Sequence, residues 1–504
     1  MSSRKRSVLV AGATAILLMV PLGASPPAGA VEEEGTHSPN VTHVINHQHR
    51  ERFLEGELGG GGSDIEFATL RVRTAAARRL GIGAGKKPFA LAGSYDNGLQ
   101  LVDISNPTDP VTVGVYDCIV RQGDVQVFKR GDNTYAAYTH DDPYDAGLDS
   151  TCYREATELS LFTEGTTDPA GTFIVDISNP AKPRTVSFIS VPRGSHNQTV
   201  APGGKYLYNS NSDLGRVAPS AIEIFDITHF SNPQSVGTLP LTTGLDSHDI
   251  TFNEAGDRAY VAAITHSLVL DTTDLAKPKI IGRIIDPAIN IHHQSDPVTL
   301  TDPILGERTF LVVTDELAGA AGNAVCPGGG LHVYDISGSL EQNPVKVGAW
   351  FSPGVRETGT SNLTCTSHVL RMYPEHGLMT IAWYNAGVRV VDISGLVGLS
   401  VGVDETQGNL TPGMKELGYY YFPDSDTWSV KTNVIEPDGS FYMYGNDLAR
   451  GLDVYRFEAG ETAARETGTW MSPAQALSLA QARGVTSTSG ATGPYCLWRG
   501  LQVG

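Results

Sequence analysis

Short stretches of alternating apolar and polar residues recur along most of the chain, separated by clusters of Gly, Asn, Asp and Pro. Residues 248–285 show the order most clearly. His248–Glu254 alternates, the turn 255–257 follows, and three further stretches of this kind succeed one another up to Ile285. A period of two residues is typical of strands with one buried face, and turn residues between them favour hairpins. The pattern therefore predicts repeated sheets of four antiparallel strands.

One phrase marks the third strand of each predicted sheet: two apolar residues, an aspartate, an apolar residue or Thr, then Ser or Thr. Its seven copies begin at Leu101, Ile174, Ile224, Val269, Val333, Val390 and, in degenerate form, Gly451. A ring of four-stranded sheets is a β-propeller, and the competing β-helix has shorter repeats. We therefore predict an all-β fold, a seven-bladed propeller over residues 64–473, with a short helix and a flexible tail at 474–504.

The ends of the predicted ring are less regular than its middle. We expect the first inner strand within Asp64–Val72 and assign Asn40–Arg50 to a leader segment. Thr467–Pro473 repeats the pattern of residues 347–353, which predicts an outer strand of the last blade.

Residues 1–30 have the pattern of an export signal. Arg4–Arg6 are basic, Val8–Val20 is apolar, and Ala28–Ala30 supplies the small residues of a cleavage site. A transmembrane anchor is the alternative, but the run is short for a span and prolines follow it. We expect a signal peptide cleaved near Ala30, a partly disordered leader at 31–63, and a secreted protein whose mature form has no membrane span.

Charge narrows the classes of partner. Loss of residues 1–30 lowers the formal net charge from −19 to −22, because three cations leave and no acid does. An acidic surface argues against nucleic acid and anionic lipid. It favours a neutral or cationic small molecule, an extracellular or cell-wall ligand, or a metal ion.

Histidines mark the starts of several predicted inner strands. His196 and His248 stand at the same distance before Tyr208 and Tyr260, and each follows a serine. The same register assigns this position to His368 in blade six, Asp296 in blade five, Asp124 in blade two and Lys431 in blade seven, with His292 and His293 just upstream of Asp296. Inner strands line the channel of a propeller, so these side chains are expected to meet at its mouth.

Several imidazoles with carboxylates nearby form a donor set for Fe, Cu, Mn or Zn. The candidate ligands are His196, His248, His292, His293, Asp296 and His368. An open position on such a metal can activate water or dioxygen. The alternative is structural, because a Ser–His pair repeated in each blade can brace the fold, as in WD-type propellers. The third-strand aspartates, such as Asp226 and Asp271, can brace it in the same way.

Acids and cysteines map to the same mouth. The acids that end second strands are Asp96, Asp141, Asp142, Asp315, Glu316 and Asp447. They are either solvated loop acids or ligands for calcium or another cation. Cys118 with Cys152 and Cys326 with Cys365 are candidate disulfides, thiolate metal ligands being the alternative, and Cys496 is left over.

The DISNP phrases at Asp103–Pro107 and Asp176–Pro180 resemble the LVIVD-repeat family of extracellular propellers, and the resemblance covers most of residues 88–457. It implies the architecture and says little about chemistry. The His-rich strand starts are also loosely similar to the propellers of selenium-binding-protein-type thiol oxidases, which use a metal. Two functions follow: a metal-dependent extracellular oxidoreductase, or a non-catalytic binding propeller whose Ser–His pairs are braces.

Overall fold

The computed structural model describes most of the chain beyond residue 34. The described ranges are 35–50, 61–95, 97–120, 122–141, 150–162, 169–191, 194–211, 220–242, 246–304, 306–316, 329–352, 366–399, 413–460 and 469–482, with the backbone of 58–59. The expected signal peptide lies outside them, and export stays a prediction. No helix in these ranges is both long enough and apolar enough to cross a membrane.

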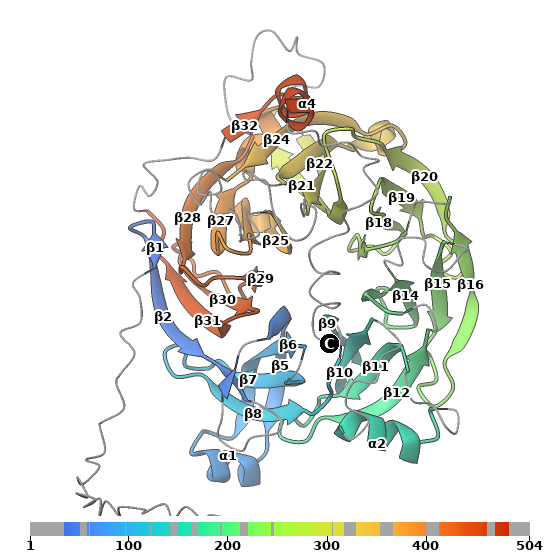
Figure 1. The fold of residues 1–504 in the computed structure, drawn as a ribbon, viewed down its shortest axis with the longest axis vertical. Helices are drawn as coiled ribbons and strands as arrows, with labels where there is room; N and C mark the ends of the chain where they lie inside the picture. The colour runs from blue at the N-terminus through green and yellow to red at the C-terminus, as the bar shows by residue number, and fades with distance from the viewer. Residues whose placement is uncertain are drawn as a thin grey trace, which may run out of the picture. The chain divides into compact units, whose positions relative to one another are not determined.

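Seven antiparallel sheets surround a common centre, which confirms the predicted seven-bladed propeller (Figure 1). In each sheet the first strand lies nearest the centre and the fourth lies at the periphery. Apolar side chains from neighbouring sheets pack between them: the rings of Tyr116 in blade one and Phe173 in blade two have centroids 6.3 Å apart. Each blade therefore buries its faces against its neighbours, as expected of a repeat fold.

The first three blades follow the chain in order. Blade one is β5 (Gly62–Val72), β6 (Gly85–Ser94), β7 (Leu99–Asp103) and β8 (Val111–Tyr116), with α1 (Thr74–Leu80) between its first two strands. Blade two is β9 (Gln122–Arg130), β10 (Asn133–His140), β11 (Gly171–Asp176) and β12 (Arg184–Ser190), with α2 (Thr151–Glu158) in its long insertion. Blade three is β13 (Asn197–Val200), β14 (Tyr206–Ser210), β15 (Ala221–Asp226) and β16 (Gln234–Pro240).

The remaining blades continue this order. Blade four is β17 (Asp249–Phe252), β18 (Arg258–Ala262), β19 (Ser267–Asp271) and β20 (Lys279–Ile284). Blade five is β21 (His292–Asp302), β22 (Gly306–Asp315), β23 (Leu331–Asp335) and β24 (Val345–Phe351), with η2 (Gly338–Glu341). Blade six is β25 (Leu370–Tyr373), β26 (Leu378–Ala382), β27 (Val388–Asp392) and β28 (Lys415–Tyr421), with η3 (Pro374–His376) and η4 (Ser394–Gly398). Blade seven begins with β29 (Thr427–Lys431), β30 (Phe441–Asp447) and β31 (Gly451–Phe457).

The N-terminal part of the described chain closes the ring. β2 (Val41–His47), which the sequence interpretation assigned to a leader, pairs antiparallel with β31 and is the fourth strand of blade seven. β1 (Thr36–His37) adds a fifth strand to blade six, and the two-stranded β3 (His49–Arg50) and β4 (Leu58–Gly59) follow. Val41 is fully buried, as expected of an apolar residue in a strand that packs against the rest of the ring.

Because β2 fills the outer place of blade seven, the expectation for Thr467–Pro473 is wrong. β32 (Thr469–Met471) instead pairs with β24 and extends blade five, with Trp470 opposite Trp350. Gly348 of β24 makes room for it, since a Cβ there would lie 2.2 Å from an atom of the Trp470 ring. α4 (Pro473–Ala482) follows, close to the expected C-terminal helix.

The repeated aspartate phrase stabilises the turn after the third strand. In blade one, the Asp103 carboxylate accepts hydrogen bonds from the Ser105 amide at 2.9 Å and the Ser105 hydroxyl at 2.6 Å. Asp176, Asp226, Asp271, Asp335 and Asp392 accept the equivalent amide. This Asx-type turn explains why Asp is followed two residues later by Ser or Thr.

Candidate functional site

Four histidines from four successive blades stand in a row around the channel mouth. The ring centroids are 4.4 Å apart between His196 and His248, 4.2 Å between His248 and His293, and 4.2 Å between His293 and His368. Each side chain lies at or just before the start of an inner strand, and each residue is buried. The structure therefore brings together four of the six predicted ligands.

Hydrogen bonds of these histidines and their serines run between blades. The Nδ1 atoms of His248 and His368 lie 2.9 and 2.6 Å from the backbone oxygens of His293 and Trp428, in the following blade. The Ser247 hydroxyl lies 2.6 Å from that of Ser210, in the preceding blade. A carbonyl can only accept, so Nδ1 carries the proton and Nε2 keeps its lone pair. Bracing and metal binding are thus compatible, because they use different nitrogens.

A buried carboxylate completes the cluster. Ligand atoms of His248, His293 and Glu316 all lie within 4.8 Å of one another. Glu316 Oε2 is 3.6 Å from His293 Nε2, and Glu316 Oε1 is 3.7 Å from His368 Nε2. The hydroxyl of Tyr384 donates to Glu316 Oε1 at 2.5 Å, which orients the carboxylate. The metal centre suggested by the geometry is therefore two imidazoles and one carboxylate, with His368 beside them.

The protonation state of the imidazoles suits this chemistry. Burial, followed by the charges of the neighbouring histidines, lowers the pKa of His293 well below its ordinary value. Burial also lowers the pKa of His248 and of His368 well below its ordinary value. The hydrogen bond from each histidine to a backbone carbonyl acts in the opposite direction but does not outweigh burial. All three are neutral near pH 7, and the neutral imidazole is the form that binds metal.

His196, at the end of the row, makes hydrogen bonds to side chains through both of its ring nitrogens. Its Nδ1 donates to the carboxylate of Asp141 at 2.9 Å, and its Nε2 accepts from the Gln122 amide nitrogen at 3.0 Å.

Two residues that contact the cluster have an unusual backbone conformation. Gln122 has a φ of 82° and Tyr384 a φ of 41°. Non-glycine residues rarely adopt this left-handed region, and such strain concentrates at functional sites.

The other predicted site residues lie elsewhere. A bulge between His292 and Gln294 puts His293 at the level expected for Asp296. His292 is directed to the Ser267 hydroxyl, 2.8 Å from its Nδ1. Asp315 accepts hydrogen bonds from the backbone amides of Asn290 and Ile291. Of the remaining rim acids, Asp447 binds the amide of Asp426, while Asp96 and Asp142 lie outside the described residues.

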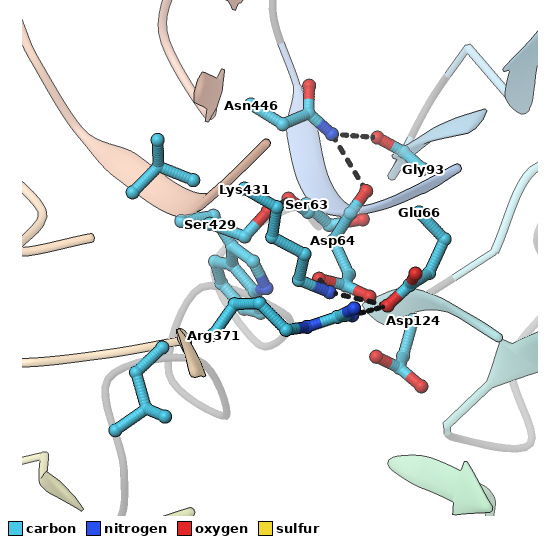
Figure 2. A network of polar contacts seen from close by, with 12 residues as sticks. Ser63, Asp64, Glu66, Gly93, Asp124, Arg371, Ser429, Lys431 and Asn446 are labelled. Atoms are coloured by element: carbon cyan, nitrogen blue, oxygen red, sulfur yellow. Dashed lines mark hydrogen bonds and ion pairs between the residues drawn. The ribbon is translucent and has the colours of Figure 1, made fainter. Parts of the chain in front are cut away.

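Asp124, Asp296 and Lys431 lie farther along the inner strands, in a second layer of charged residues. Figure 2 shows part of it. Lys431 Nζ donates to Asp64 at 2.8 Å and to Glu66 at 2.9 Å, and Arg371 also binds Glu66. Burial raises the pKa of Glu66, but the charges of Arg371 and Lys431 outweigh it and hold that pKa below its usual range.

Three acids of this layer have a pKa above its ordinary value, in contrast to Glu66. Burial and then the charges of Asp64 and Asp249 raise the pKa of Asp124 well above its ordinary value. Burial and the charge of Asp296 raise the pKa of Asp249 to about 7. Burial likewise raises the pKa of Asp296. The sequence interpretation did not include Asp64, Glu66, Asp249 or Arg371, although each lies in or just beside a predicted inner strand.

One predicted disulfide is present among the described residues. Cys118 and Cys152 are bonded, which ties the segment after blade one to α2 in the insertion of blade two. Cys326, Cys365 and Cys496 lie outside the described ranges, and their pairing stays a prediction.

The fold and its row of buried histidines define a seven-bladed β-propeller with a polar centre. The model of the LVIVD-repeat family matches residues 89–118 and 168–189, in blades one and two. No curated protein matches the sequence.

Many solved structures are similar to the chain, and two of them show the level of similarity. A putative 6-phosphogluconolactonase from Bacteroides uniformis is 12% identical, with a TM-score of 0.36 over 63% of this chain and 77% of that one. A functionally unknown protein from Desulfotomaculum acetoxidans is also 12% identical, with a TM-score of 0.42 over 67% of this chain and 84% of that one. At this level of similarity neither carries an argument about activity.

Proposed function

We propose that the chain is an exported, metal-dependent oxidoreductase whose ion is held by His248, His293 and Glu316. The observation that carries the proposal is the convergence of their ligand atoms within 4.8 Å in a buried site. Imidazole nitrogen with carboxylate oxygen is a donor set for Fe, Cu, Mn or Zn, and two histidines with one carboxylate are typical of non-haem iron sites. When bound, such an ion supplies activation of dioxygen or water.

The residues around the ligands have roles that follow from their contacts. The carbonyl of His293 fixes the orientation of His248, and the Tyr384 hydroxyl fixes that of Glu316. Such outer contacts raise metal affinity. His368 Nε2 lies 3.7 Å from Glu316, so it serves as a further ligand or accepts a proton beside the ion. Burial of the cluster excludes bulk water.

The disulfide supports the exported location of this enzyme, because disulfides persist mainly in oxidising compartments. Calcium has less support. Asp141, Asp315 and Asp447 each bind a group of the protein itself, a histidine or backbone amides. We therefore assign the metal to the histidine cluster and a neutral or cationic small molecule as the substrate class.

Metal analysis of untagged protein tests the proposal. The protein is incubated separately with Fe, Cu, Mn and Zn, desalted, and measured by elemental analysis. We expect about one ion per chain, as three protein ligands hold one ion. Dioxygen consumption is then followed with thiols, amines and phenols as reductants.

Glu316→Gln and His248→Ala are expected to lose the metal and the dioxygen consumption. The matched control is His229→Ala, because His229 is an exposed histidine remote from the cluster. Far-ultraviolet circular dichroism shows whether each variant is folded. Less than about a tenth of an ion per chain for every metal, in folded wild-type protein, overturns the proposal.

The second candidate function is a non-catalytic binding propeller. The observation that favours it is the set of bonds from histidine Nδ1 and serine hydroxyls across blade boundaries, which a purely structural brace also needs. In that case wild-type protein binds no metal, and folded His248→Ala protein keeps its ligand binding.

A further inference from the structure

A cavity lies along the channel, and the histidine cluster does not line it. It has a volume of about 680 Å³ and extends past the charged layer to the turns that end the inner strands, such as Pro202–Gly204. None of His248, His293 or Glu316 lines it. Its volume is that of a small-molecule binding cavity. We call it the acidic chamber.

Acids outnumber cations in the wall of the acidic chamber. Its lining contains six acids and three cations: Asp64, Glu66, Asp124, Asp249, Glu254 and Asp296 with Lys129, Arg371 and Lys431. Lys431 binds Asp64 and Glu66, and Arg371 binds Glu66. Three acids contact neutral donors: Asp124 the Gln198 amide at 3.3 Å, Asp249 the Ile250 amide at 2.7 Å, and Asp296 the Thr251 hydroxyl at 2.5 Å.

A buried oxygen atom without a hydrogen-bond donor favours a ligand that carries N–H groups. Gln198 is 2% exposed and lines the chamber. Its amide nitrogen donates to Asp124 and to the backbone oxygen of Ala137, while its Oε1 has no hydrogen-bond partner among the described residues. A buried oxygen without a donor is costly, and a ligand that brings N–H groups removes that cost.

The spacing of the acids decides the size of the ligand. Among the described residues, the only group of three or more acids, histidines or cysteines whose ligand atoms lie within 4.8 Å of one another is the histidine cluster. The chamber acids are therefore too far apart to surround one bare metal ion, but they suit a ligand with several separated positive charges. Lys431 shows how the wall binds an ammonium group, with two carboxylate oxygens at 2.8 and 2.9 Å.

We infer that the acidic chamber binds an aliphatic diamine or polyamine, with Asp124, Asp249 and Asp296 receiving its ammonium groups and Gln198 accepting one of its N–H bonds. Charge-assisted hydrogen bonds of this kind are about twice as strong as neutral ones. The chamber shares no residue with the proposed metal centre, although Asp249 directly follows His248, and we expect the two sites to bind their ligands independently.

Titration calorimetry with putrescine and spermidine tests the inference, on full-length mature protein treated with EDTA. We expect saturable binding of one ligand per chain with a dissociation constant below about 1 mM. The neutral 1,4-butanediol, matched to putrescine in length, is expected to give no heat of binding. Asp124→Asn and Asp249→Asn are each expected to weaken binding about tenfold or more, since each replaces an acid that can ionise against an ammonium group by an amide that cannot.

The matched control is Asp274→Asn, because Asp274 is an exposed acid of the outer turn and its replacement makes the same change of charge. It is expected to leave binding unchanged. Equal binding of the diol, equal weakening by Asp274→Asn, or no saturable binding overturns the inference. So does competition in which Ca²⁺ displaces the amine and binds more tightly.

His248→Ala separates this site from the metal centre. Folded His248→Ala protein is expected to bind spermidine with wild-type affinity whatever its metal content. Loss of spermidine binding in that folded variant would overturn the independence of the two sites.

Discussion

Lys431→Met tests the charged layer of the channel. Lys431 has 5% of its side chain exposed and Asp64 has 6%, so their ion pair is buried. Methionine nearly matches the lysine stem in volume, and the variant therefore removes a charge without opening a large cavity. Breaking a buried pair by removing one partner typically costs about 3–5 kcal/mol. Arg371 still binds Glu66 in the variant, so Asp64 is the main uncompensated charge and we expect the lower end, about 3 kcal/mol.

The loss of stability in Lys431→Met should be larger at high pH than at low pH. Burial raises the pKa of Asp64 in the folded protein, and Lys431 opposes that effect. Without Lys431 the pKa of Asp64 rises further. A carboxyl group whose pKa is higher in the folded than in the unfolded state destabilises the fold above that pKa, and protonation relieves the penalty as pH falls. The deficit of Lys431→Met is therefore expected to be larger at pH 8 than at pH 5.5.

Chemical denaturation of wild-type and Lys431→Met protein at both pH values measures the effect. Lys279→Met is the control, because Lys279 is an exposed lysine of β20. The difference in free energy of unfolding, corrected for the control, gives the contribution of the buried pair. A deficit below about 1 kcal/mol at pH 8, the size of an exposed pair, would refute the reasoning. A deficit that grows as pH falls would refute it equally.

Two further predictions concern how the ring is held together. Val41→Ala removes two methyl groups from a fully buried position of β2. We expect it to lower the free energy of unfolding by about 1–2 kcal/mol in chemical denaturation. The same substitution in an undocked leader would leave the free energy of unfolding unchanged. The double variant Cys118→Ala, Cys152→Ala opens a loop with a sequence separation of 34, for which chain entropy gives about 4 kcal/mol. A calorimetric melting temperature equal to that of the wild type under non-reducing conditions would contradict it.

The fold was predictable because its signals are local. The aspartate phrase contains both partners of its turn, as in Asp103 and Ser105, and the period of two residues places the strands around it. Closure of the ring was not predictable in this way, since β2 pairs with β31 across almost the whole chain and no residue of Val41–His47 carries the turn phrase.

The site was predicted in composition but not in register. His196, His248, His293 and His368 were all candidates, and they do form one row. Assignment of Asp296 to that row failed because a bulge in β21 changes the register, and a bulge leaves no distinct mark in the sequence. The place of Glu316 in the cluster was not predictable from the local sequence. It depends on a hydrogen bond between Glu316, after β22, and Tyr384 of blade six, two residues that are distant along the chain.

The position of β2 also sets the order of events as the chain folds. The ribosome releases the strand Val41–His47 first, yet its partner Gly451–Phe457 belongs to the last blade to be synthesised. The seam between blades one and seven, where Lys431 meets Asp64, therefore forms last, after a search across nearly the full chain, and long-range pairing of this kind is slow. Until then the ring is an open array with an unpaired outer edge at β31. A second chain can donate its own β2 to that edge, so slow closure at high concentration would produce strand-exchanged dimers.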